Sequence, residues 1–457
     1  MTELEAALAE FLPTQRWFAG KGRTVAEVRV ESEVPLRTAL PSLSAVVAAV
    51  AYADGGVERY HLPVGHDRGL EARQLTDRVP DAVIYETKGP TGGPFYDAAR
   101  DERLGGVYLD LLARAANVEE LRFYRMPEWT ETLRGPGKLL SAEQSNSSLV
   151  FGNRLILKLF RLLEPGENPE LEVTRALAGA GFSACPAPLG WIEGLGSTLG
   201  ILQPYYAGSV DGWKLATERV ADHYESKDGE PGNFAEDAAA LGRLTAELHG
   251  AMATALPKVA EGQPDLGRLS GRLLGQLTQV VALVPELADQ REAIEEVYTK
   301  AEAAGGGSHD LQRIHGDYHL GQVLEAGGTW IVIDFEGEPA RSLEERRRLA
   351  SPLQDVAGML RSFDYAAFSP LVLGDEELAR FEGPAAAWIE ANRKAFLDGY
   401  LTRAGDSGQA LGGDHELLLE AFELDKAVYE VMYEARHRPP WLQIPLGGIR
   451  RLLGASP

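Results

Sequence analysis

Two acidic residues on either side of a short apolar hairpin carry the strongest chemical signal in this sequence. Asp317 lies in a glycine-interrupted loop, and Asp334 follows the apolar run 330–333, which is typical of a buried strand. Gln322 comes five residues after Asp317, and Gly327-Gly328 predicts the turn of the hairpin. Phosphoryl transfer needs this combination. One carboxylate accepts the proton of the attacking hydroxyl, while a second carboxylate and an amide hold the Mg²⁺ that bridges the phosphates.

The spacing of these residues matches that of the protein-kinase catalytic segment, in which an Asn follows the catalytic Asp and a metal-binding Asp begins Asp-Phe-Gly. Here Gln322 replaces the Asn and Asp-Phe-Glu replaces Asp-Phe-Gly, so the sequence predicts a kinase-like site outside the protein kinases. The alternative is a hairpin with incidental surface acids. His315 and His319 could suggest zinc, but Gly316 and the lack of a Cys or an adjacent Glu favour loop bracing.

A lysine in an apolar strand is the second signal. Lys158 lies within residues 154–160, where a lysine is rarely buried unless it is paired. Kinases use such a lysine to hold the α- and β-phosphates, and a glutamate on the next helix orients it. Glu172, in a helix predicted over 169–180, is the expected partner, with Glu170 as the alternative. Without a partner, Lys158 would be an edge-strand lysine that reaches water.

The segment before this strand is expected to cover the phosphates in place of a glycine-rich loop. It offers hydroxyl, amide and backbone N–H donors at Ser145, Asn146, Ser147 and Ser148. A plain polar hairpin is the alternative. Residues 203–206 end the predicted small lobe, and by position we expect Gln203 and Tyr205 to belong to the hinge whose backbone contacts adenine.

The last predicted long helix, residues 423–438, carries polar side chains at spacings of three and four residues. They are Lys426, Tyr429, Glu430, Tyr433 and His437, of which the first four are the candidates for sugar binding. Tyrosines beside charged hydrogen-bonding groups suit a sugar, and a solvated face with core-packed tyrosines is the alternative. Asp355, earlier in the chain, is expected to brace the catalytic loop by accepting backbone N–H bonds.

The composition is that of an ordinary globular protein, with 44% hydrophobic and 25% charged residues in 457. A net charge of −23 repels nucleic acid and anionic membrane, so we expect neither as a partner. The single cysteine, Cys185, excludes an internal disulfide and fits a reducing compartment. The N-terminus lacks signal-peptide features, and the apolar run 43–53 is too short to span a bilayer. The expected location is cytoplasmic.

The chain is predicted to hold three parts. Residues 1–92 form a small α+β cap, residues 93–204 an intermediate part with the nucleotide-binding sheet of a kinase small lobe, and residues 205–457 a helical C-terminal lobe. Between the first two parts, residues 86–98 are rich in Gly, Pro and Lys and predict a linker. Within the third, one helix is predicted over 271–304.

Together these motifs resemble the actinobacterial maltokinases, relatives of the aminoglycoside phosphotransferases. The resemblance spans nearly the whole chain, in segments 15–20, 143–148, 315–322, 334–339 and 423–441. It implies an α+β, two-lobed, eukaryotic-kinase-like fold with an N-terminal cap domain. It also implies ATP and Mg²⁺ as cofactors, with Asp317 as the base, Gln322 and Asp334 on the metal, and Glu336 helping to hold a second ion. Tyr318 departs from the family, in which an aliphatic residue is common there.

The activity that this resemblance implies is the phosphorylation of maltose at its anomeric hydroxyl by a monomer. The product would be maltose 1-phosphate for α-glucan and glycogen synthesis, with trehalose synthase as a partner. Proteins of the same architecture that resemble glucosamine kinases share the ATP motifs, so glucosamine kinase, making glucosamine 6-phosphate, is the alternative. The match over 423–441 favours maltose. A non-catalytic nucleotide-binding scaffold is the remote alternative.

Overall fold

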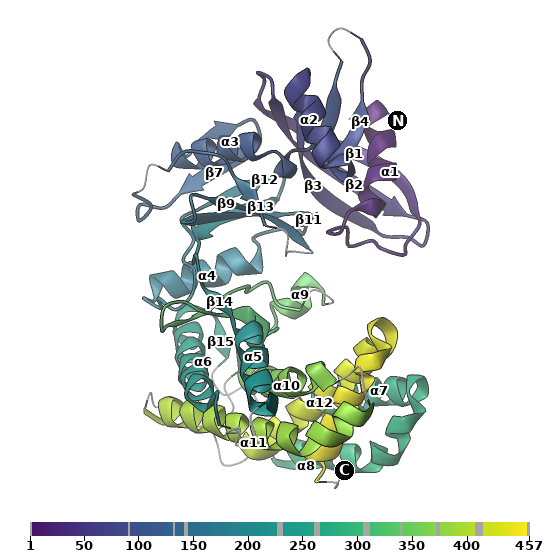
Figure 1. Ribbon diagram of the computed structural model, residues 1–457, viewed down its shortest axis with the longest axis vertical. Helices are drawn as coiled ribbons and strands as arrows, with labels where there is room; N and C mark the ends of the chain where they lie inside the picture. The colour runs from purple at the N-terminus through teal and green to yellow at the C-terminus, as the bar shows by residue number, and fades with distance from the viewer. Residues whose placement is uncertain are drawn as a thin grey trace. The chain divides into compact units, whose positions relative to one another are not determined.

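The computed structural model describes residues 2–89, 92–130, 133–140, 145–225, 232–259, 266–304, 311–338, 341–371, 375–406 and 415–454. The chain divides into two compact units, whose elements are labelled in Figure 1. Unit 1 comprises residues 1–175 and 186–207, and unit 2 comprises residues 176–185 and 208–457.

The first sheet of unit 1, here the cap sheet, is antiparallel and follows the order β1-β2-β3-β5-β4, with β11 beside β3. The N-terminal helix packs Leu8 and Phe11 inward, and Thr2 and Glu5 form a capping box at its start. Strand β2 is buried along most of its length, which explains its run of Ala and Val. The elements are α1 (Glu3–Phe11), β1 (Val25–Arg37), β2 (Ser42–Tyr52), β3 (Val57–His66), α2 (Leu70–Arg78), β4 (Val83–Glu86), β5 (Pro94–Asp97) and β11 (Leu162–Leu163).

The second sheet of unit 1, here the small-lobe sheet, follows the order β6-β7-β12-β13-β10-β9-β8. Strands β9 and β10 form a hairpin around Gly152 and Asn153, both in the left-handed backbone region, as the Gly-Asn pair favours. The elements are α3 (Glu102–Ala113), β6 (Asn117–Val118), β7 (Leu121–Arg125), β8 (Lys138–Leu139), β9 (Asn146–Phe151), β10 (Leu155–Phe160), α4 (Pro169–Gly179), β12 (Gly190–Gly194) and β13 (Ser197–Pro204).

The two sheets of unit 1 share one apolar core, which includes Leu43 and Tyr96 of the cap sheet and Leu157 and Leu199 of the small-lobe sheet. Tyr96 lies in β5, inside the stretch 86–98 that the sequence predicted as a linker. That prediction is wrong for β5, because its aromatic residues are part of the sheet. Burial of the Tyr96 ring stabilises the strand despite the Gly and Pro residues around it.

Unit 2 is mainly helical, with a three-stranded sheet of order β14-β17-β18. Helices α6 and α11 approach closely through glycine, since a Cβ at Gly242 would lie 2.0 Å from the carbonyl oxygen of Phe396. The strands are β14 (Val210–Asp211), β15 (Lys258–Val259), β16 (Leu311–Gln312), β17 (Val323–Glu325) and β18 (Trp330–Val332). The helices are α5 (Gly212–Glu225), α6 (Ala235–Ala255), α7 (Leu266–Leu283), α8 (Arg291–Ala304), α9 (Leu343–Arg346), α10 (Leu353–Phe368), α11 (Asp375–Asp406), α12 (His415–His437) and α13 (Gln443–Leu452).

The helix predicted over 271–304 is two helices. A 3₁₀ turn, Pro285–Gln290, separates α7 from α8, because a proline cannot donate the backbone hydrogen bond that an uninterrupted helix needs there. Within the described residues, no helix combines the length and apolar character that crossing a bilayer requires.

Candidate active site

The predicted catalytic hairpin is present in unit 2. Strands β17 and β18 pair antiparallel, and Gly327 and Gly328 turn between them with positive φ angles of 64° and 86°. Asp317 precedes the hairpin and Asp334 follows it. Asp334 itself has a φ of 64°, a left-handed conformation that is uncommon for a non-glycine residue and is enriched at functional sites.

Helix α10 supports the catalytic loop through the side chain of Asp355. The carboxylate of Asp355 accepts the backbone N–H groups of His315 at 2.8 Å and Gly316 at 2.9 Å, and it lies 3.2 Å from Nε2 of His249. Burial alone would raise the pKa of Asp355, but His249 and these N–H donors outweigh it and hold the pKa below its usual range. Nε2 of His315 lies 2.9 Å from the carbonyl oxygen of Ile333. The bracing roles predicted for Asp355 and His315 are therefore confirmed.

Tyr318, the departure from the family pattern, points into the core. Its hydroxyl is hydrogen-bonded at 3.0 Å to the hydroxyl of Thr245 on α6, and the side chain is only 2% exposed. A Cβ at Gly358 of α10 would lie 2.6 Å from the carbonyl oxygen of Tyr318. Two helices thus fix the residue next to the predicted base.

The predicted metal ligands of unit 2 lie together. Nε2 of Gln322 is 3.2 Å from Oδ2 of Asp334, and the carboxylates of Asp334 and Glu336 have oxygens within 4.8 Å of each other. A rotation of the Gln322 amide would place its oxygen beside the same carboxylate. Two carboxylates and an amide oxygen form the hard oxygen set that Mg²⁺ prefers, so these residues fit the ion.

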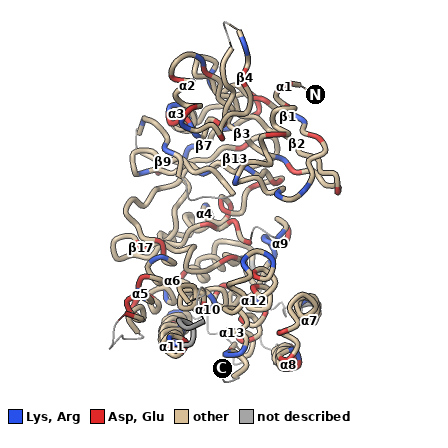
Figure 2. Tube along the Cα trace, turned by 45° about the vertical axis from the view of Figure 1, so that its right-hand side comes forward, with Lys and Arg blue, Asp and Glu red and all other residues tan. Residues whose placement is uncertain are grey.

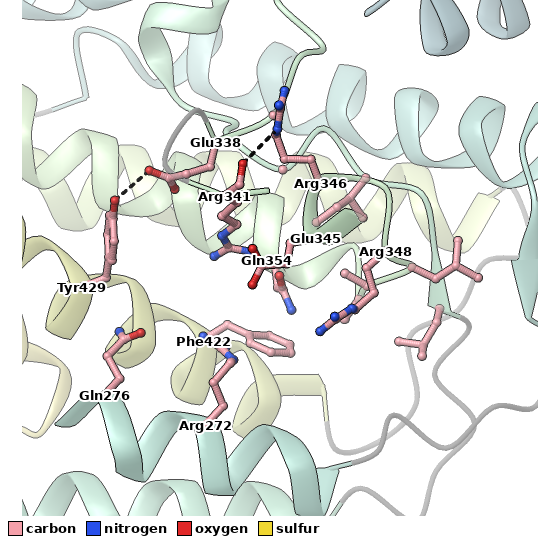
Figure 3. A pocket seen from close by; sticks show the side chains of 17 residues that line it. Arg272, Gln276, Glu338, Arg341, Glu345, Arg346, Arg348, Gln354, Phe422 and Tyr429 are labelled. Carbon is pink, nitrogen blue, oxygen red and sulfur yellow. Dashed lines mark hydrogen bonds between the residues drawn. The ribbon is translucent and has the colours of Figure 1, made fainter. Parts of the chain in front are cut away.

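The predicted base lies beside a lysine of α12. Nζ of Lys426 is 3.9 Å from Oδ1 of Asp317 and 3.4 Å from Oε2 of Glu338. The Tyr429 hydroxyl donates to Oε1 of Glu338 at 3.0 Å (Figure 3). The structure thus brings together Asp317, Lys426 and Tyr429, as predicted, and adds Glu338. The signal for Glu338 was available, because it continues the every-second-residue acidic pattern of Asp334 and Glu336.

The charges of this cluster support one another. Burial favours the neutral form of Glu338, but Lys426 and the Tyr429 hydroxyl outweigh it, and the pKa of Glu338 lies below its usual range. Burial would likewise lower the pKa of Lys426, yet Glu338 and Asp317 hold that pKa above its usual range. Both groups are therefore charged at neutral pH.

Two of the four residues predicted to bind sugar lie elsewhere. Oε2 of Glu430 accepts from Nε and Nη2 of Arg361 at 3.0 and 2.8 Å, and only 8% of Glu430 is exposed. Tyr433 is 41% exposed and stacks on His437 with ring centroids 4.6 Å apart. Neither residue lines the cavities beside Asp317. Glu430 is thus a core ion-pair residue in this structure.

In unit 1, Nζ of Lys158 on β10 lies 2.7 Å from Oε2 of Glu170 on α4, and the two side chains are 12% and 3% exposed. The lysine is paired, as predicted for a phosphate-holding residue. The expected partner was Glu172 and the alternative was Glu170, and this short contact favours the alternative. Glu170 and Glu172 are two positions apart, so they point to different sides of the helix. The sequence alone did not show which of these sides faces Lys158.

The residues predicted to cover the phosphates are placed differently from one another. Ser145 is exposed, whereas Asn146, Ser147 and Ser148 lie inside β9 with buried side chains. The Ser147 hydroxyl accepts a hydrogen bond from Nε of Arg161 at 2.8 Å, which ties it to the protein interior. The predicted role of these donors in covering the phosphates stays a prediction, and residues 141–144 lie outside the described part of the chain.

At the predicted hinge, Gln203 and Tyr205 both form hydrogen bonds within unit 1. The Gln203 amide donates to the carbonyl oxygen of Pro186 at 3.1 Å, and the backbone N–H of Tyr205 donates to the carbonyl oxygen of Arg154 at 2.8 Å. These bonds fix the end of β13. The predicted contact with adenine stays a prediction.

A cavity of about 810 Å³ lies beside the catalytic loop in unit 2, and a smaller one of about 50 Å³ adjoins it. Gly316, Glu338 and Tyr429 line both, and Asp317 and Lys426 line the smaller one. The larger volume falls in the range of small-molecule sites. The cluster around Asp317 therefore opens onto space for an acceptor.

The phosphotransferase enzyme family model matches residues 137–400, and the maltokinase N-terminal cap domain model matches residues 11–101. A glucosamine kinase of Mycolicibacterium smegmatis is 29% identical over 402 residues, covering 85% of this chain and 97% of that protein. A glucosamine kinase of Streptacidiphilus jiangxiensis is 31% identical over 321 residues, covering 66% and 70% respectively.

Among solved structures, a glucosamine kinase in complex with glucosamine, ADP and inorganic phosphate has a TM-score of 0.70 and 23% identity. The match covers 97% of this chain and 99% of that one. At that identity the likeness establishes the fold, which is the two-lobed phosphotransferase fold with an N-terminal cap that the sequence predicted.

Proposed function

Because the chain belongs to the phosphotransferase enzyme family, we propose that it is an ATP-dependent sugar kinase whose acceptor is maltose. The observation that carries the proposal is the cluster of Asp317, Lys426, Glu338 and Tyr429 beside the cavity of about 810 Å³. A carboxylate, an ammonium and a tyrosine at the edge of such a space suit an acceptor that is rich in hydroxyl groups.

Each residue of the cluster has a role in this reaction. Asp317 accepts the proton of the attacking hydroxyl, and Lys426, 3.9 Å away, holds its carboxylate in place. Glu338 and Tyr429 hydrogen-bond the sugar. Gln322, Asp334 and Glu336 would hold Mg²⁺, which neutralises charge on the transferred phosphoryl group, and Lys158 with Glu170 holds the α- and β-phosphates.

Two features favour maltose over a monosaccharide. The cavity beyond Asp317 and Tyr429 extends to α7, α9 and the start of α10, so its lining reaches far past the cluster that meets the first ring. Its wall also carries four arginines, which repel the ammonium group of an amino sugar. The match to a maltokinase cap domain agrees with this choice.

Glucosamine, phosphorylated to glucosamine 6-phosphate, is the second candidate, because the two relatives described above are both glucosamine kinases. In that case Glu338 is the carboxylate available to the ammonium group, and the sugar would have to compete for it with Lys426.

The test is Mg²⁺-dependent ADP release with maltose, glucosamine and glucose side by side, followed by identification of the product. Turnover on maltose with loss of the reducing end supports the proposal, since phosphorylation at the anomeric position removes it. Turnover on glucosamine with the reducing end intact replaces maltose by the second candidate. ATP binding without turnover on any sugar favours a non-catalytic scaffold.

A further inference from the structure

The larger cavity concentrates positive charge in a strongly acidic chain. Its lining includes four arginines, Arg272, Arg341, Arg346 and Arg348, but only two acids, Glu338 and Glu345, whereas the whole chain carries a net charge of −23. In Figure 2, basic and acidic residues both lie along α9 and the segment around it. Figure 3 shows that Arg272, Arg341 and Arg348 reach into the cavity around Phe422.

Both acids of the cavity have other partners. Glu345 accepts hydrogen bonds from the backbone N–H and hydroxyl of Ser342 at 3.0 and 2.8 Å, as part of the capping box of α9. Glu338 is held by Lys426 and Tyr429. Glu345 also interacts electrostatically with Arg341 and Arg348, and Glu338 with Arg341, so two carboxylates serve four guanidinium groups as well as these other partners.

The arginines differ in how they are compensated. Nη2 of Arg272 lies 2.9 Å from Oδ2 of Asp425, and Arg346 donates to the backbone carbonyl groups of Glu336 and Arg341. Within the described residues, no ion pair or hydrogen bond engages the guanidinium groups of Arg341 and Arg348. Because the four cations outnumber the two acids of the lining, they repel one another, and a bound anion would relieve that repulsion.

We propose that this cavity binds the phosphate monoester of a sugar, with the phosphate on Arg341 and Arg348 and the sugar toward Tyr429. Guanidinium groups recognise phosphate through paired, charge-assisted hydrogen bonds. The sugar part follows from the shared lining, because Gly316, Glu338 and Tyr429 border both this cavity and the one that contains Asp317. A sugar phosphate held there occupies the space of the acceptor.

Given the proposed function, sugar phosphate bound at this site also regulates turnover. A sugar kinase releases a sugar phosphate, so its own product belongs to the class of ligand that the arginines recognise. The product therefore competes with the acceptor, and turnover slows as the sugar phosphate accumulates.

Calorimetric titration with glucose 1-phosphate tests the site without turnover. The full chain is used with Mg²⁺ and a non-hydrolysable ATP analogue, so that the triphosphate site is filled. We expect binding to wild type and to Arg243→Gln, an exposed arginine of α6 outside the cavity, and affinity weaker by about tenfold or more in Arg341→Gln/Arg348→Gln. Equal affinity in the double variant overturns the proposal, and inorganic phosphate that binds as tightly as glucose 1-phosphate overturns its sugar part.

Inhibition kinetics test the competition separately. We expect glucose 1-phosphate to inhibit wild type competitively with the acceptor, and its inhibition constant to rise about tenfold or more in the double variant. Inhibition that acceptor cannot relieve contradicts the shared space. If no sugar is phosphorylated, the proposed function fails, while the titration still decides whether the anion site exists. Thermal unfolding of the double variant confirms that it folds.

Discussion

At the scale of single residues, the proposed function makes Asp317 the group on which turnover depends most directly. Its carboxylate lines the smaller cavity that adjoins the larger one, with Lys426 3.9 Å away. Asp317→Asn keeps the shape of the side chain and removes its ability to accept a proton. We expect kcat to fall on the order of 10²- to 10⁴-fold in an ADP-release assay, the range found for general bases.

The affinity of the Asp317→Asn variant for ATP and its thermal unfolding should stay close to those of wild type, because the residue bonds mainly at the acceptor side. A loss of activity below about tenfold would show that another group removes the proton, since it lies well under the range for a general base.

A substitution of Gln322 tests whether this residue binds the metal ion or only supports the loop. Its amide is 3.2 Å from the carboxylate of Asp334. Gln322→Ala removes one oxygen ligand, so the Mg²⁺ concentration for half-maximal rate should rise about tenfold or more, as for other losses around metal sites. Saturating Mg²⁺ should restore most of the rate. An unchanged Mg²⁺ requirement would remove Gln322 from the metal site.

At the scale of elements, α12 presents a clean comparison between two tyrosines. Tyr429 donates to Glu338 at the acceptor cavity, whereas Tyr433 is exposed and stacks on His437. We expect Tyr429→Phe to raise the KM of the sugar by severalfold to about tenfold, the value of one hydrogen bond, with a smaller effect on kcat. Tyr433→Phe is the matched control and should leave both constants unchanged. Equal effects from the two variants would mean that the sugar does not meet this side of the helix.

The same helix explains how far sequence reasoning reaches. Spacings of three and four residues grouped Lys426, Tyr429, Glu430 and Tyr433, but successive residues on a helix point about 100° apart. In the structure Tyr429 lines the cavities beside Asp317, whereas Glu430 does not. The pattern could identify the amphipathic helix but not the partner, Arg361, that claims Glu430. The sequence predicts which face of the helix is polar, and the packing of the folded protein determines which residues of that face can contact a ligand.

The catalytic hairpin was predictable for the opposite reason. Its signals are local, since Gly327 and Gly328 allow the turn and the apolar run before Asp334 forms the buried strand. The bracing of the loop by Asp355 was also predictable, because a buried carboxylate needs donors. The left-handed backbone of Asp334 and the buried places of Ser147 and Ser148 depend on tertiary contacts, and no local pattern encodes them.

At the scale of the whole molecule, the arrangement of charge sets the response to acid. The net charge of −23 produces self-repulsion at neutral pH, which weakens as carboxylates gain protons. Opposing this, the buried carboxylates of Asp355 and Asp364 have pKa values below their usual range, through His249 and backbone donors in one case and through Arg361 and Arg451 in the other. Acid should therefore relieve repulsion first and remove specific stabilisation later.

The direction in which pH changes the free energy of unfolding depends on whether the folded or the unfolded state binds protons first. When the folded-state pKa of a carboxyl group lies below its unfolded value of about 3.9, the unfolded chain binds the proton first as pH falls. The stabilisation by Asp355 is thus complete above about pH 5 and is lost as pH falls through about 4 toward the folded-state pKa. Urea unfolding measured across this range should give a free energy of unfolding that holds or rises from neutral pH to about 5 and then drops.

Asp355→Asn tests which carboxylate carries this dependence. The two carboxylate oxygens accept separately from the backbone N–H groups of His315 and Gly316, so the variant keeps an acceptor for only one of them and loses the charge. We expect it to be less stable by about 1–3 kcal/mol at neutral pH and to lose less stability below pH 5 than wild type does. Asp398→Asn, at an exposed position paired with Lys394, should follow the wild-type curve. Parallel curves for wild type and Asp355→Asn would place the acid sensitivity in other carboxylates and leave Asp355 as a neutral brace of the loop.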